Sequence, residues 1–169
     1  MTLPEFPEDG PGVVRAGSAP ARQDPRKFDA QLAPRLLAAH GTLNTRFAEQ
    51  VGTIDRDPAA AARVIEECLR QFSAIRHIET IWLHPVLEHA VDADAGVRGQ
   101  VMELRLIGLI LARRVLRCFE DLQQAIRAEV FVTESAARAT DALARYSKHS
   151  EHVVYPLYEL VGTQRQEAA

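Results

Sequence analysis

Two segments of the chain concentrate side chains that could bind a metal ion. Residues 77–88 read HIETIWLHPVLE and residues 149–159 read HSEHVVYPLYE. Each segment places a His-x-Glu ahead of an aromatic residue, a proline and a further glutamate, and together they hold four of the six histidines. Imidazole and carboxylate groups bind iron and other transition metals. Whether the segments form a site depends on which of these side chains face the protein interior.

The chain from about residue 27 onward has the pattern of amphipathic helices. Apolar residues recur at alternating steps of three and four, which keeps them on one face of a helix. The stretches GTIDRDP, DADAG and VFVTES interrupt this pattern. We expect Asp57 before Pro58, Asp94 and Thr133 to begin the second, third and fourth helices. The sequence therefore predicts an all-α fold, an antiparallel up-down-up-down four-helix bundle.

The inward stripe of each expected helix follows from the same spacing. The first helix gives Leu32, Leu36, His40, Leu43, Phe47 and Val51. The second gives Ala61, Ile65, Cys68, Phe72, Ile75, Glu79, Trp82 and Val86. The third gives Val97, Val101, Leu104, Gly108, Leu111, Val115, Cys118 and Leu122. The fourth gives Ala139, Leu143, Tyr146, Ser150, Val153, Leu157 and Leu160.

Glu79 is the most informative polar residue within these stripes. A buried carboxylate must be protonated, hydrogen-bonded or bound to a cation. Its expected partners are His40, Tyr146 and Ser150, with Arg105 reaching in from a flank. Ferric iron held by an imidazole, a carboxylate and a phenolate is one interpretation. The other is a neutral hydrogen-bonded core in which His40 and Tyr146 share a protonated Glu79.

The histidines of the two opening segments fall mostly outside the stripes. We expect His77 and His84 to face solvent on an outer face with Glu88. That face is either a solvated charged surface or a surface or inter-subunit metal site, because His84 and Glu88 are four residues apart. His149 lies at the edge of the inward stripe and could turn into the bundle, whereas His152 lies further out.

Together these features resemble the hemerythrin-like, or HHE cation-binding, domain family. The resemblance covers about residues 30–162 and is carried by RLLAAH, AIRHIETIWLHPVLE and ARYSKHSEHVVYPLYE. It implies a four-helix bundle around a non-heme di-iron centre. In that family the second and fourth helices each supply a His and, four residues later, a Glu, and the first and third helices each add one His.

The family pattern can be laid on the chain with its two aromatic-proline pairs as anchors. His40 then falls at the first-helix ligand and Glu79 at the second-helix carboxylate. The remaining positions hold Ile75, Tyr146 and Ser150, and the third-helix segment LRLIGL has no histidine. His77 and His149 are displaced from ligand positions unless a π-bulge restores the register. The resemblance implies a reduced site of His40, Glu79, Tyr146 and His149, with His77, His84, Glu88 and His152 as outer candidates.

The rest of the composition limits the classes of protein. A formal charge of −3 without a Lys/Arg cluster argues against a nucleic-acid or acidic-membrane partner. Two cysteines without metal-ligand spacing suit the cytoplasm. Residues 1–26 are predicted to be a flexible Pro/Gly-rich arm without signal-peptide character, 27–163 the bundle and 164–169 a short polar tail. No apolar run is long enough to span a bilayer.

Three functions remain open from the sequence. The first is a metal-binding protein that uses iron or another divalent metal to store or sense the metal, or to bind O2 or NO. The second is a metal-free interaction or regulatory bundle that has lost the di-iron site. The third is a heme-binding bundle with His40 or His149 as axial ligand. No nucleophile-base arrangement favours an enzyme, and a homodimer is left open.

Overall fold

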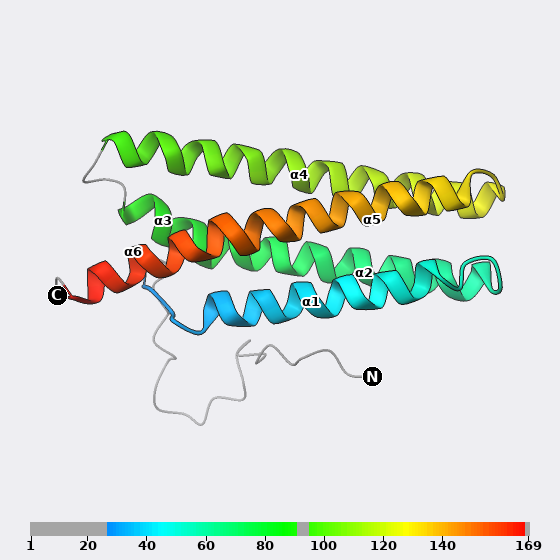
Figure 1. The fold of residues 1–169 in the computed structure, drawn as a ribbon, viewed down its shortest axis with the longest axis horizontal. Helices are drawn as coiled ribbons and strands as arrows, with labels where there is room; N and C mark the ends of the chain where they lie inside the picture. The colour runs from blue at the N-terminus through cyan, green and yellow to red at the C-terminus, as the bar shows by residue number, and fades with distance from the viewer. Residues whose placement is uncertain (1–26, 91–94, 168–169) are drawn as a thin grey trace, which may run out of the picture.

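The computed structural model describes residues 27–90 and 95–167, and all its regular elements in that part of the chain are helical. They form four helical rods (Figure 1). The first rod is α1 (Leu32–Val51), and the third is α4 (Ala95–Ala128). The second joins α2 (Pro58–Ile78), a π-helical turn η1 (Glu79–Leu83) and α3 (His84–Ala90). The fourth joins α5 (Val132–His149), a second π-helical turn η3 (Ser150–Val154) and α6 (Tyr155–Glu167). The predicted all-α class is confirmed, and the arrangement is consistent with a four-helix bundle.

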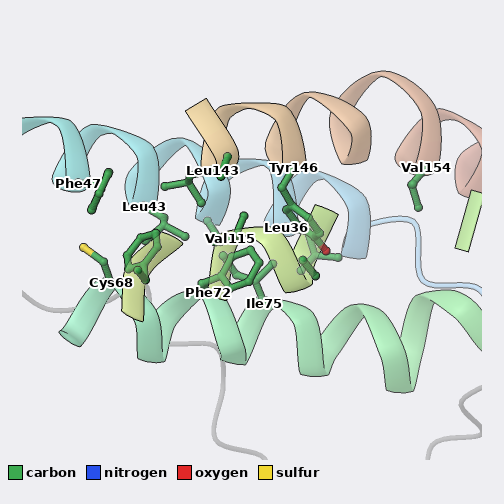
Figure 2. Close-up of a cluster of buried hydrophobic side chains, with 14 of the residues drawn as sticks. Leu36, Leu43, Phe47, Cys68, Phe72, Ile75, Val115, Leu143, Tyr146 and Val154 are labelled. Carbon is green, nitrogen blue, oxygen red and sulfur yellow. The ribbon is translucent and has the colours of Figure 1, made fainter. Parts of the chain in front are cut away.

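The rods enclose one hydrophobic core. α1 packs against α2 and α5, and α4 packs against the same two helices. At the end of the molecule that carries Pro85 and Pro156, α3 also packs against α6. The core takes buried side chains from every rod, including Leu36, Phe72, Val115 and Leu143 (Figure 2). Burial of these apolar stripes is the main force that holds the rods together.

The start of α2 agrees with the prediction from the sequence. Asp57 is the N-cap, its Oδ1 accepts a hydrogen bond of 2.9 Å from the Ala60 amide, and Pro58 is the first helical residue. Proline at this position costs no backbone hydrogen bond, because the first amides of a helix have no acceptor within the helix. The predicted cap Asp94 lies outside the described residues, as does the predicted arm 1–26.

The start of α5 and the end of α6 differ from the prediction. α5 begins at Val132 instead of Thr133, because the chain turns through Glu129 and Phe131, both with positive φ. Phe131 is left-handed and makes no side-chain cap. At the other end α6 continues to Glu167, so the predicted polar tail is helical over its first four residues. None of the helices in the described ranges is long and apolar enough to cross a membrane.

The two π-helical turns occupy equivalent places in the second and fourth rods. The amide of His84 donates to the carbonyl of Glu79, and the amide of Tyr155 donates to that of Ser150, so each bond spans five residues. A proline follows directly in both cases, at positions 85 and 156. A proline inside a helix lacks an amide hydrogen and crowds the carbonyl four residues earlier. A π-turn at that point inserts one extra residue and rotates every later side chain.

This rotation corrects the predicted stripes within and beyond each π-turn, except at Val86, which is buried as predicted. Leu83 is fully buried where the prediction placed Trp82, which is half-buried. In the fourth rod, the predicted inward residues Val153 and Leu160 are exposed and Leu157 is half-buried. The buried residues there each lie one position further along, and they are Val154, Tyr158 and Val161. Before the π-turns the predicted stripes of α1, α2 and α5 are buried, except for the half-buried Val51 at the end of α1.

The stripe of α4 is confirmed only in part. Val101, Val115 and Leu122 are buried as predicted. Four other predicted positions are half-buried, namely Leu104, Gly108, Leu111 and Cys118. Ala112 and Phe119 are buried instead, so the core-facing side of α4 is turned slightly from the predicted one.

Candidate functional site

The buried carboxylate of Glu79 is the centre of the candidate site. Glu79 is 2% exposed and is the first residue of η1. Its Oε1 accepts hydrogen bonds from the hydroxyls of Tyr155 at 2.8 Å and Ser150 at 3.3 Å. Its Oε2 accepts from the hydroxyl of Tyr146 and from Nη1 of Arg76, the latter at 3.2 Å. Four donors from two rods therefore converge on one carboxylate.

Arg76 supplies the positive charge beside this carboxylate. It lies three residues before Glu79 on the same rod, and its Nη1 also donates to the Tyr146 oxygen at 3.0 Å. The guanidinium carbon lies 5.6 Å from the centre of the Tyr146 ring, within cation-π range. The side chain of Arg76 is 21% exposed and that of Glu79 3%. The ion pair thus lies between the core and the surface, with its anionic end fully enclosed.

The surroundings of Glu79 favour its ionised form. Burial alone would raise the pKa of this carboxyl, but the nearby His40 ring and the hydrogen bonds from Tyr146 and Tyr155 outweigh burial and lower the pKa to about 2. Burial and the adjacent Glu79 charge raise the pKa values of Tyr146 and Tyr155 far above their ordinary value. Both phenols therefore stay neutral and act as donors. The protonated Glu79 considered from the sequence is not what this geometry favours.

His40 faces Glu79 across the interior, as predicted. His40 is 2% exposed, and its Nε2 lies 3.6 Å from Oε1 of Glu79. This distance is slightly long for a hydrogen bond, and no other described residue is a partner of Nε2. On the other side of the ring, Nδ1 lies 3.2 Å from the hydroxyl of Ser147, which accepts a 3.1 Å bond from Asn44. Ser147 and Asn44 therefore fix the orientation of the His40 ring.

The other predicted inner histidine is not part of this centre. His149 is half-buried at the edge of the stripe, as expected. Its Nε2 lies 3.3 Å from the carbonyl oxygen of Leu104 on α4, beside Gly108. It contacts the third rod instead of the carboxylate of Glu79. A heme iron would need an open position over a histidine nitrogen. Nε2 of His149 is directed at the Leu104 carbonyl, and Nε2 of His40 lies without a hydrogen bond 3.6 Å from the Glu79 carboxylate.

Of the four outer candidates, three lie where they were predicted and one does not. His77, Glu88 and His152 are exposed. His84, expected on the surface, is half-buried and lines a small cavity with Leu87 and Val154, among others. The extra residue of η1 rotates His84 inward, which explains the difference. Burial lowers the pKa of His84 to about 4, so the ring is neutral near pH 7.

Arg105 does not reach Glu79, contrary to the expectation. It forms a surface ion pair with Glu88, and both side chains are about half exposed. Arg76 takes the role predicted for Arg105, and Tyr155 is a second partner that the sequence patterns missed. Arg76 was detectable from its three-residue distance to Glu79 on one helix. Tyr155 turns inward only because of the π-turn before Pro156, so that proline was the available signal.

The residues at the centre do not fit the metal site implied by the family resemblance. No three His, Cys, Asp or Glu side chains of residues 27–90 and 95–167 lie close enough together to hold one metal ion. Nε2 of His40 is the one nitrogen at the centre without a partner, and both oxygens of Glu79 already accept hydrogen bonds. The phenolate expected from Tyr146 is disfavoured, because its proton is held by Glu79. This set of donors provides hydrogen bonds to a carboxylate and few free ligands for a cation.

Comparisons with protein-family models, with curated proteins and with solved structures find no match to this chain.

Proposed function

We propose that this chain is an interaction or regulatory protein, a bundle of hemerythrin-like type in which a hydrogen-bonded polar centre replaces the metal site. The observation that carries the proposal is the convergence of Tyr146, Tyr155, Ser150 and Arg76 on the carboxylate of Glu79. A buried carboxylate with this many donors is stable without a metal. The interior then has a structural role, and the surface is left for binding.

Arg76 is the part of the centre that most strongly opposes a metal ion. Its guanidinium keeps its charge at any physiological pH and holds Oε2 of Glu79 at 3.2 Å. A cation about 4 Å from a guanidinium meets a repulsion of about 4 kcal/mol per unit of charge at an effective dielectric constant near 20. A divalent ion would therefore have to displace Arg76 or bind against twice that repulsion.

The antiparallel up-down-up-down order of the rods is part of the same proposal. The α1–α2 and α4–α5 connections lie at one end of the molecule (Figure 1). The connection between α1 and α2 takes six residues and that between α4 and α5 three. Short connections are typical of antiparallel neighbours in bundles. The thiols of Cys68 and Cys118 are free, which suits the cytoplasmic location that we also propose.

The test of the proposal is the metal content and the metal dependence of stability. Untagged protein is expressed with excess iron, analysed for bound metals, and melted with and without a chelator. We expect metal far below one atom per chain and the same melting temperature in both samples. Stoichiometric iron that is lost in Glu79→Gln, together with a lower melting temperature after chelation, would favour the competing metal-binding hypothesis. The double variant His77→Gln, His152→Gln serves as the control, because it removes exposed histidines that could bind iron at the surface.

A further inference from the structure

The longest helix exposes an apolar face on the side away from the core. Six aliphatic side chains on α4 leave between 37% and 66% of their surface exposed. Ile107 lies to one side, and the other five share one side of the helix: Met102, Leu106, Leu109, Ile110 and Leu116. Met102, Leu106 and Leu109 continue to Arg113 and Leu116 at steps of four, three, four and three. This is the spacing of a seam between two helices. We call these five aliphatic residues the α4 face.

The α4 face is not needed for packing within the chain. The opposite side of α4 contacts α2 and α5 through Val115, Phe119 and Leu122, which are fully buried. A helix that is apolar on both sides is expected to have a second partner. Exposed aliphatic residues on soluble proteins are usually scattered singly, and a continuous row marks an interaction site.

Charged residues at the two ends of the α4 face indicate what covers it. Glu103 lies beside the first apolar residues, and Arg113 and Arg117 lie along the later ones. All three side chains are exposed, and none forms an ion pair with any residue of the described ranges. The face thus carries an unpaired negative charge at one end and two unpaired positive charges toward the other, where Glu120 follows four residues beyond Leu116.

We propose that the α4 face binds a second copy of this chain, with the two α4 helices antiparallel about a two-fold axis that crosses the face between Leu106 and Ile110. In this arrangement Glu103 of each copy lies opposite Arg113 and Arg117 of the other, and the apolar rows meet between them. A parallel pairing would place each charged side chain opposite the identical side chain of the other copy, and like charges repel. A closed two-fold dimer uses the same patch on both chains, so one face satisfies both partners.

The size of the face is adequate for a dimer of the usual kind. From residue 99 to residue 120, α4 is about 30 Å long at 1.5 Å per residue. A stable interface buries about 800 Å² on each partner and combines an apolar centre with a polar rim. The five aliphatic side chains and the apolar stem of Arg113, which lies in the same row, supply the centre, and Glu103 and Arg117 supply the rim. The inference names a partner for the interaction role proposed above.

The mass of the full-length chain in solution tests this proposal. Sedimentation equilibrium over a concentration series should give twice the mass of one chain. The double variant Leu106→Glu, Ile110→Glu should give the mass of one chain, with unchanged helical content by circular dichroism. Leu160→Glu is the matched control, because Leu160 is an equally exposed leucine on α6 and should leave the dimer intact. A wild-type chain that stays monomeric up to about 100 μM, where even a weak specific dimer would be populated, would overturn the proposal.

Charge reversal tests the antiparallel direction. Glu103→Arg should weaken dimerisation at least tenfold, because it faces two arginines of the other copy. Adding Arg113→Glu and Arg117→Glu to the same chain should restore the dimer, since every cross-pair is again opposite in sign. A triple variant no tighter than Glu103→Arg alone would contradict the antiparallel pairing. A monomeric wild type that co-sediments with phosphatidylglycerol vesicles, and loses that binding in the Leu106→Glu, Ile110→Glu variant, would assign the face to a lipid surface instead. Mass is measured independently of metal content, so this inference and the proposed metal-free centre can fail separately.

Discussion

Replacing Arg76 with methionine removes the positive charge at the buried centre while keeping most of the side chain's apolar stem. Breaking a fully buried ion pair by removing one partner costs about 3–5 kcal/mol, because the other charge is left uncompensated. Arg76 is 21% exposed, so water can compensate part of the loss. Tyr146 still donates to Glu79 in this variant. We therefore expect Arg76→Met to lower the free energy of unfolding by about 2–3 kcal/mol at pH 7.

Urea denaturation followed by circular dichroism measures this change directly. The matched control is Arg105→Met, which breaks the Glu88 pair on the surface, where both side chains are about half exposed. The control should cost less than about 1 kcal/mol. Equal losses in the two variants would refute the view that Arg76 compensates a buried charge.

The pH dependence of the free energy of unfolding, compared between the wild type and Arg76→Met, gives a second readout. Burial raises the pKa of Glu79, but His40, Tyr146 and Tyr155 outweigh burial. Together they lower this pKa from 4.5 to about 2 in the folded chain. A lowered carboxyl pKa adds stability that is present above pH 4.5 and is lost as the pH falls toward 2. The full difference corresponds to about 3 kcal/mol at 1.36 kcal/mol per unit. Arg76 lies 3.2 Å from Oε2 of Glu79, so its removal should raise the folded pKa of Glu79, and this loss should then begin at a higher pH and be smaller.

The remaining predictions concern single contacts. Tyr155→Phe removes the 2.8 Å hydrogen bond to Oε1 and should cost about 1.5–3 kcal/mol in urea denaturation; an unchanged stability would mean that water replaces the hydroxyl. The double variant His77→Gln, His152→Gln should change the free energy of unfolding by less than about 0.5 kcal/mol, because both side chains are exposed. Gly162→Ala should cost about 1–3 kcal/mol by thermal melting, since the new Cβ would overlap the Phe28 ring; a neutral effect would show that the ring moves aside freely.

The sequence was sufficient to predict the helical rods and the opposition of His40 and Glu79. Both depend on residues that precede the π-turns or, like Glu79, begin one, and up to that point steps of three and four follow the α-helix. Counting fails at Val153 and Leu160, because Val153 lies within η3 and Leu160 lies beyond it, and the turn adds one extra residue. The same insertion brings Tyr155 onto Glu79. A proline inside an otherwise continuous helical pattern was the cue for this change of period.

The choice between arginines was not predictable from periodicity alone. Arg105 and Arg76 both lie on helices beside Glu79, and both side chains are long enough to turn toward or away from the core. Arg105 pairs with Glu88 at the surface, whereas Arg76 turns toward Tyr146 and Glu79. The position of the phenol, which receives a hydrogen bond from Arg76 and stacks near its guanidinium, depends on packing between two rods. Such tertiary packing is outside the reach of a one-helix pattern.

The central claim is that Glu79 is ionised within a network that needs no metal. The most direct measurement is the pKa of this carboxyl, followed by ¹³C NMR of the labelled side chain in protein treated with a chelator, and assigned with Glu79→Gln. The hydrogen bonds and the neighbouring His40 predict that the carboxyl stays ionised down to well below pH 4.5 and titrates with a pKa of about 2. A Glu79 pKa at or above 4.5 in the metal-free protein would contradict the account, because it would show that burial outweighs the donors and that a further cation is needed to hold the charge.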